Sequence, residues 1–285
     1  MLPILSILGA VFLWGSSFSA MRTILQDLNP FAAMFCRLFI AFIFILPISG
    51  KMIPKSYQKG DWKFLLPMVL FQPCLYFLFE SKALMFTTSS QAGIISACLP
   101  LMVAVAAWFF LAEKINTRTI IGLLLSIFGV VLLTVFQSEQ ANAPHPILGN
   151  LLEVCAMVSA CANMILVKKL SVRYDTWSLT GMQICAGTLF FLPGIRYITI
   201  VDPSIWTLKL VSLLFYLGVF VSFFSFGLYN WGISKIEASR ASIFINLIPV
   251  TAILLGWLLL GEILNPLQIL ATFIIISGVF LGNQS

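Results

Sequence analysis

Three ionisable side chains lie inside long apolar runs of the sequence, and their types make them the first candidates for chemistry. They are Arg37, Glu80 and Glu153. A charge in hydrocarbon is costly, so such residues tend to face an interior cavity or a partner. Arg37 with one or both carboxylates could form an outer gate or a proton-responsive pair, or Arg37 could receive a carboxylate ligand. The alternative is a static ion pair between helices, or a Glu80 side chain that extends to the lipid headgroups.

Neutral polar and aromatic side chains within the apolar runs are the next candidates. Buried amides and hydroxyls could bind a small polar ligand, or they could join helices by hydrogen bonds. Two prolines lie in the middle of apolar runs, where each removes a backbone hydrogen bond and frees a carbonyl group, so we predict a shared hinge or kinks that line a cavity. These ten further candidates for the cavity or gate are Trp14, Ser17, Gln91, Pro100, Asn163, Gln183, Tyr229, Asn230, Asn246 and Pro249.

Residue patterns for enzymatic chemistry are missing from the sequence. The single histidine, His145, lies between two prolines, and the six cysteines form no CxxC pair. Neither a zinc site, nor a nucleophile with its base, nor a phosphate-binding loop can be assembled from such residues. We therefore expect no catalytic residue, no metal and no cofactor, and we predict that the protein is not an enzyme.

The composition places these candidates in a membrane. Hydrophobic residues make up 60% of the chain and charged residues 9%, too few polar groups to cover a water-soluble globule. Many runs are apolar on all sides, which excludes the alternating pattern of barrel strands. We predict an all-α integral membrane protein with ten transmembrane helices, each of about 20 residues. The predicted spans are 2–21, 30–50, 63–82, 88–111, 117–136, 147–168, 176–195, 208–232, 239–260 and 265–283.

The two halves of the sequence are related by a duplication. The segment Ser90–Leu132 recurs at Ser239–Leu281 without a gap, and 13 of 43 positions are identical. The identical pairs include Ser90/Ser239, Pro100/Pro249, Trp108/Trp257, Glu113/Glu262 and Gly129/Gly278. We predict a first repeat at 1–138 with helices one to five, a linker at 139–146, and a second repeat at 147–285 with helices six to ten. Because five is odd, the repeats must be inverted, which is typical of secondary transporters.

The distribution of basic residues predicts the orientation. Eleven lysines and arginines fall in one set of loops and four in the opposite set. Basic loops favour the cytoplasmic side, so both termini are expected in the cytoplasm, in a plasma membrane of the bacterial inner-membrane type. This asymmetry accounts for the net charge of +6, and the scattered basic residues form no nucleic-acid motif.

Several motifs together resemble the EamA family of the drug/metabolite transporter superfamily over nearly the whole chain. They are Phe12-Leu13-Trp14-Gly15-Ser16-Ser17-Phe18, Arg37 followed by Leu-Phe-Ile-Ala, Phe79 to Leu84, Trp108 to Lys114, and Gly256 to Glu262. The resemblance implies a ten-helix carrier that exports or exchanges small metabolites such as amino acids, or drug-like compounds. The second repeat departs from the first, with Gln183 at the position of Arg37.

The functional expectation combines symmetry with this resemblance. We expect a gradient- or exchange-driven secondary transporter with a small-molecule substrate, exporting amino acids or related compounds by alternating access around a central cavity between the repeats. Protons are a candidate coupling ion, the bilayer is the expected partner, and a homodimer is a candidate assembly. The alternatives are a multidrug-type efflux carrier and a membrane sensor or scaffold that does not transport.

Overall fold

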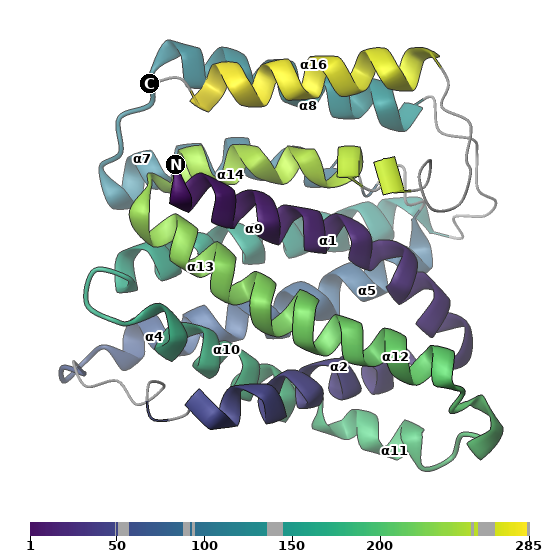
Figure 1. The fold of residues 1–285 in the computed structure, drawn as a ribbon. Helices are drawn as coiled ribbons and strands as arrows, with labels where there is room; N and C mark the ends of the chain where they lie inside the picture. Colours follow the sequence, from purple (N-terminus) through teal and green to yellow (C-terminus); the bar gives the residue numbers. More distant parts are fainter. Residues whose placement is uncertain are drawn as a thin grey trace. The chain divides into compact units, whose positions relative to one another are not determined.

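The computed structural model describes residues 1–48, 50, 57–87, 92, 95–135, 145–251, 254–255 and 266–283. Within these residues every regular element is helical (Figure 1). The chain folds into two compact units. Unit 1 comprises Met1–Cys74 and Leu166–Lys235, and unit 2 comprises Leu75–Ile165 and Ile236–Ser285. Each unit therefore contains helices from both halves of the sequence.

Helices of unit 1 begin where the local sequence supplies a start signal. Proline occupies the first turn of the first two helices, and the side chain of Asn29 accepts a 2.9 Å hydrogen bond from the backbone N–H of Phe31. Asp175 caps α10 in the same way through Trp177, also at 2.9 Å. The elements are α1 (Leu2–Asp27), α2 (Pro30–Ile45), η1 (Leu46–Ile48), α4 (Trp62–Val69), η2 (Leu70–Leu75), α10 (Thr176–Phe190), η3 (Leu192–Gly194), α11 (Ile195–Ile198), η4 (Pro203–Ile205), α12 (Leu208–Tyr216), η5 (Leu217–Phe224) and α13 (Ser225–Lys235).

Unit 1 is held together by close packing of its helices. Helices α1 and α13 run side by side (Figure 1), and α2 contacts both α10 and η5. A Cβ atom on Gly218 would lie only 2.9 Å from the carbonyl oxygen of Arg37, so a glycine is needed where η5 meets α2. Buried apolar side chains such as Ile24, Leu28 and Leu217 fill the core.

Unit 2 is built around a tight helix pair. Helices α8 and α16 lie side by side (Figure 1). A Cβ atom on Gly122 would lie 2.6 Å from the carbonyl oxygen of Gly278, which shows how closely the two backbones approach. These glycines thus pack helices within one chain, and a homodimer stays a prediction. The elements are α5 (Tyr76–Phe86), α7 (Leu99–Leu111), α8 (Thr117–Val135), α9 (Pro146–Leu170), α14 (Ala238–Ile243), η6 (Phe244–Leu247) and α16 (Pro266–Asn283).

The observed helices fall close to the predicted spans, but membrane crossing is indicated for only some of them. Three stretches of the described chain are long and apolar enough to cross a membrane, namely Trp62–Ala83, Ile147–Leu170 and Leu208–Lys235. The bent pair Thr176–Phe190 and Leu192–Ile198 would make a fourth, and five other apolar helices are shorter. Ten spans, inverted repeats and cytoplasmic termini therefore stay predictions.

Interruptions of the helices are the main departure from the predicted continuous spans. In η2, Gln72 has the non-helical angles φ −144° and ψ 126°, immediately before Pro73. Pro100 lies in the first turn of α7, after a turn at Ala97 and Cys98, rather than inside an unbroken helix. Pro249 follows the 3₁₀ segment η6. Proline lacks an N–H and clashes with the preceding turn, which explains why helices are interrupted beside it.

Candidate functional site

A buried amide cluster in unit 1 joins two of the predicted residues. The Nδ2 group of Asn230 on α13 donates to Oε1 of Gln183 on α10 at 2.8 Å, and to the hydroxyl of Thr180 at 3.0 Å. Nε2 of Gln183 donates to the carbonyl oxygen of Gln72 at 3.4 Å. Gln72 is the interrupted position of η2, so a side chain supplies the partner that helical backbone would otherwise provide.

An aromatic group adjoins this cluster along α13. The ring centroids of Trp14 and Tyr229 are 4.9 Å apart, and those of Trp14 and Phe226 are 6.3 Å apart. Ser17 donates to the carbonyl oxygen of Trp14 at 2.8 Å, which is an intrahelical bond. Tyr229 directly precedes Asn230 on α13, so Trp14 of α1 and Gln183 of α10 both contact this helix.

Arg37 is buried in unit 1 with a hydroxyl partner. Its side chain is 5% exposed, and its Nε donates to Oγ of Ser222 in η5 at 2.6 Å. A buried guanidinium needs several acceptors, because its five N–H groups are all donors. Glu80 and Glu153 belong to unit 2, so the predicted pairing of Arg37 with a carboxylate stays a prediction.

The two predicted carboxylates lie within unit 2. Oε1 of Glu80, on α5, accepts a 2.6 Å hydrogen bond from the hydroxyl of Tyr76. Glu153, on α9, is 1% exposed, and its Oε1 lies 2.8 Å from Oγ of Ser96. Both carboxyl groups thus belong to the same unit, and each has a hydroxyl group as a partner.

The remaining predicted residues are distributed over unit 2. Asn246 donates to Ser126 on α8 at 2.8 Å, a bond that joins helices, and Asn163 is buried in α9. Pro249 is partly buried and Pro100 is buried. Gln91 lies outside the described residues, as does most of the predicted linker 139–146. The predicted amides thus divide between the two units, with Gln183 and Asn230 in unit 1 and Asn163 and Asn246 in unit 2.

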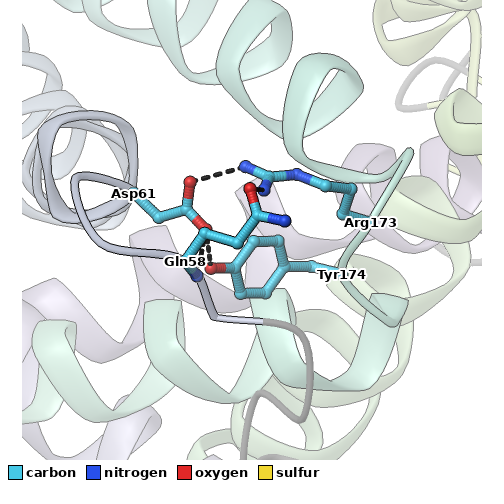
Figure 2. A network of polar contacts seen from close by, with 4 residues as sticks. All are labelled: Gln58, Asp61, Arg173 and Tyr174. Atoms are coloured by element: carbon cyan, nitrogen blue, oxygen red, sulfur yellow. Dashed lines mark hydrogen bonds and ion pairs between the residues drawn. The ribbon is translucent and has the colours of Figure 1, made fainter.

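A polar network in unit 1 connects two loops at the ends of helices (Figure 2). Asp61 forms an ion pair with Arg173 at 2.5 Å and accepts a hydrogen bond from the hydroxyl of Tyr174 at 2.6 Å. Gln58 accepts from Arg173 and donates its backbone N–H to Asp61 at 2.9 Å. The hydrogen bond from Tyr174, then that from Gln58, and the Arg173 charge hold the pKa of Asp61 below its ordinary value. Burial, followed by the bond to Asp61, raises the pKa of Tyr174 to about 12.

The hydrogen-bond partners of the predicted site residues were not predicted from the sequence. Thr180, Ser222 and Ser96 are hydroxyl residues inside apolar runs, and Gln72 acts through its backbone carbonyl. Pro73 within a predicted span was an available signal for the interruption. The hydroxyl residues carry no distinguishing pattern, because serine and threonine often bond to their own helix.

The described part of the chain holds no group of three or more His, Cys, Asp or Glu side chains that could bind a metal. Its polar groups are instead arranged as small hydrogen-bonded sets. Such sets can bind a ligand or a proton, or they can join helices.

Comparisons with known proteins agree with this architecture. The EamA-like transporter family matches residues 1–135 and 147–283. The "Uncharacterized transporter YoaV" of Bacillus subtilis is 28% identical over 285 residues, covering 98% of this chain and 96% of that protein. The "Uncharacterized transporter YetK" of the same species is 26% identical, covering 96% and 84%. A crystal structure aligns with a TM-score of 0.82 at 18% identity, covering 98% of this chain and 95% of the other, which shows the shared fold. The chain belongs to the EamA-like transporter family.

Proposed function

We propose that the protein is a gradient- or exchange-driven secondary transporter that exports amino acids or related small metabolites. In this proposal two inverted repeats alternate access to a central cavity. Two observations support a transporter: the family match across both halves of the chain, and relatives that carry the name of transporters. The direction of transport, export, is taken from the resemblance to the family alone, and the amino-acid cargo is taken from that resemblance and from its match to the buried polar groups.

The amide cluster beside the interrupted helix carries the proposal. Non-helical backbone within a membrane segment is tolerated where it is buried in protein or lines a water-filled cavity, and interrupted helices commonly build transporter binding sites. In unit 1 the carbonyl oxygen of Gln72 and the amides of Gln183 and Asn230 provide acceptors and donors. The same unit holds the buried guanidinium of Arg37. These groups match the ammonium and carboxylate of an amino acid.

A multidrug-type efflux carrier is the second candidate, and the aromatic group favours it. The Trp14 and Tyr229 rings, which contact each other at a tilt, could together with Phe226 hold an apolar or cationic organic compound. A sensor or scaffold without transport is the third possibility, and it predicts no saturable flux.

The test begins with a mass-spectrometric screen of metabolites exported by an overexpressing strain, followed by counterflow of the exported compounds in proteoliposomes. Asn230→Leu should reduce counterflow at least about tenfold, a loss of about 1.4 kcal/mol, because it removes the donor to Gln183 and Thr180. Thr188→Val is the matched control on α10. In the described part of the chain, the Thr188 hydroxyl donates to the carbonyl oxygen of Ile184 in its own helix. An absence of saturable counterflow for every compound would refute the proposal, and export of organic cations alone would favour the second candidate.

A further inference from the structure

We propose that Glu153 is a proton-binding residue, whose carboxyl group takes up a proton from water on one side of the membrane and releases it to water on the other. The inference rests on the proposed transport function and identifies its coupling ion. Glu153 lies on α9, within the apolar stretch Ile147–Leu170 that is long enough to cross a membrane. Its side chain is 1% exposed. An ionised carboxylate in such surroundings needs strong partners.

The hydrogen bonds of Glu153 are too few for an ionised carboxylate. Its Oε2 is buried and has no hydrogen-bond partner in the described part of the chain. Its Oε1 has the Ser96 hydroxyl at 2.8 Å. Glu113, in the same unit, is a carboxylate with several hydrogen-bond donors. Its two oxygens accept from the N–H groups of Ala238 and Ser239 and from the Ser239 hydroxyl. The contrast indicates that Glu153 is uncharged in this conformation.

The position of Ser96 indicates the direction of the bond. Oγ of Ser96 lies 2.8 Å from Glu153 and also 2.9 Å from the carbonyl oxygen of Ala92. A serine hydroxyl has one hydrogen and two lone pairs, so it can donate fully to only one of these oxygens. If Glu153 is protonated, its O–H donates to Ser96 while Ser96 donates to Ala92, and each hydrogen is used once. An ionised Glu153 would instead compete with Ala92 for a single hydrogen.

Glu80, on α5, is a second carboxyl group in the same unit as Glu153. Two carboxyl groups in an apolar medium disfavour double ionisation, because like charges repel. Glu80 accepts from the Tyr76 hydroxyl at 2.6 Å, which stabilises its own negative charge. Lys82 on the same helix is exposed, and its position two residues further on places it on another face. The proton is therefore assigned to Glu153.

Such a group can couple transport to a proton gradient. When Glu153 is protonated its side chain is neutral and stable in apolar surroundings, and release of the proton requires contact with water. A protein whose two facing states differ in this contact would load the proton on one side and release it on the other. Ser96→Ala would remove the bonding partner of the acid and leave the carboxyl group in place.

The first experiment detects the proton directly, without a cargo. Infrared difference spectra of the full-length protein in lipid, recorded between acidic and alkaline pH, should contain the carbonyl band of a buried protonated carboxylic acid. Glu153→Gln should remove this band, Ser96→Ala should shift it, and the control Glu113→Gln should leave it unchanged. Identical spectra for the wild type and Glu153→Gln would overturn the proposal.

The second experiment measures coupling in proteoliposomes with a compound that passes the counterflow screen. An imposed pH gradient should drive accumulation in the wild type, and Glu153→Gln should lose this accumulation while counterflow continues, because exchange needs no net proton movement. Accumulation that survives Glu153→Gln would overturn the proton proposal and leave the transporter proposal standing. Absence of counterflow in the wild type would instead refute the transporter proposal, and the infrared band would still decide whether Glu153 binds a proton.

Discussion

The carboxylate of Glu113 caps the start of α14 through Ser239. Oε2 of Glu113 accepts from the Ser239 hydroxyl at 2.8 Å and from its backbone N–H at 3.1 Å, and Oε1 accepts from the N–H of Ala238 at 2.7 Å. The first N–H groups of a helix lack partners within the helix, and a negative charge there is favourable. Glu113 and Ser239 are both identical to their counterparts in the other repeat. The repeated pattern therefore includes residues that cap a helix.

Replacing this capping carboxylate should lower stability. We expect Glu113→Ala to lower the free energy of unfolding by about 0.5–2 kcal/mol, the usual range for the loss of a helix cap. The loss is measured as a lower midpoint of thermal unfolding in detergent. Glu237→Ala is the matched control, because Glu237 is exposed at the N-cap position of α14 and makes no side-chain capping bond. Equal effects of the two substitutions would contradict the capping role.

The Asp61 network should contribute stability that is lost in acid. The pKa of Asp61 is held below its ordinary value of about 3.9, so the unfolded chain binds more protons in this range. The contribution is therefore present above about pH 4 and disappears as the pH falls through the folded-state pKa. The stability difference between the wild type and Asp61→Asn should shrink in this acidic range. A difference that is constant with pH would contradict the prediction.

Tyr174 should show the opposite dependence at alkaline pH. Its pKa is raised to about 12, whereas an unfolded tyrosine titrates near about 10. The folded state keeps the proton to higher pH than the unfolded state does. The contribution of Tyr174 to stability is therefore fully present below about pH 10 and is lost as the pH rises towards 12. Ultraviolet absorbance of tyrosinate, compared between the wild type and Tyr174→Phe, should assign the late titration to this residue. A difference spectrum that titrates near pH 10 would argue against the bond to Asp61.

The close packing of α8 against α16 should make any side chain at Gly122 destabilising. A Cβ atom there would lie 2.6 Å from the Gly278 carbonyl oxygen, so Gly122→Ala should separate the helices and cost about 1–3 kcal/mol. The control is Gly9→Ala, whose Cβ atom would lie 3.6 Å from Leu228, an ordinary contact. Thermal unfolding of both variants in the same detergent checks the prediction, and it fails if Gly9→Ala is the more damaging.

Arg37 should be needed for transport. Arg37→Gln removes the charge that could gate the pathway or bind a substrate carboxylate, and we expect at least about a tenfold loss of counterflow, about 1.4 kcal/mol. The matched control is Arg196→Gln, because Arg196 is exposed on α11. Size-exclusion profiles must confirm that both variants fold. Full transport by Arg37→Gln would exclude the gate and leave a structural role for the bond to Ser222.

Helix positions and family membership could be predicted from the sequence. Apolar runs, prolines in first turns and caps such as Asn29 act over a few residues, so the observed α2 and α8 begin at the predicted positions 30 and 117. In an apolar solvent the backbone must satisfy its own hydrogen bonds, which makes the helix the default for such runs. The local sequence therefore contains this information.

Only the tertiary structure identified the partners of the polar residues. Arg37 bonds to Ser222, 185 positions away, and Glu153 bonds to Ser96, 57 positions away. No local pattern encodes such pairs, because they depend on which helices pack together and on how each is rotated. The interruption at Gln72 likewise depends on tertiary structure, because Pro73 permits it while the distant amide of Gln183 satisfies the freed carbonyl.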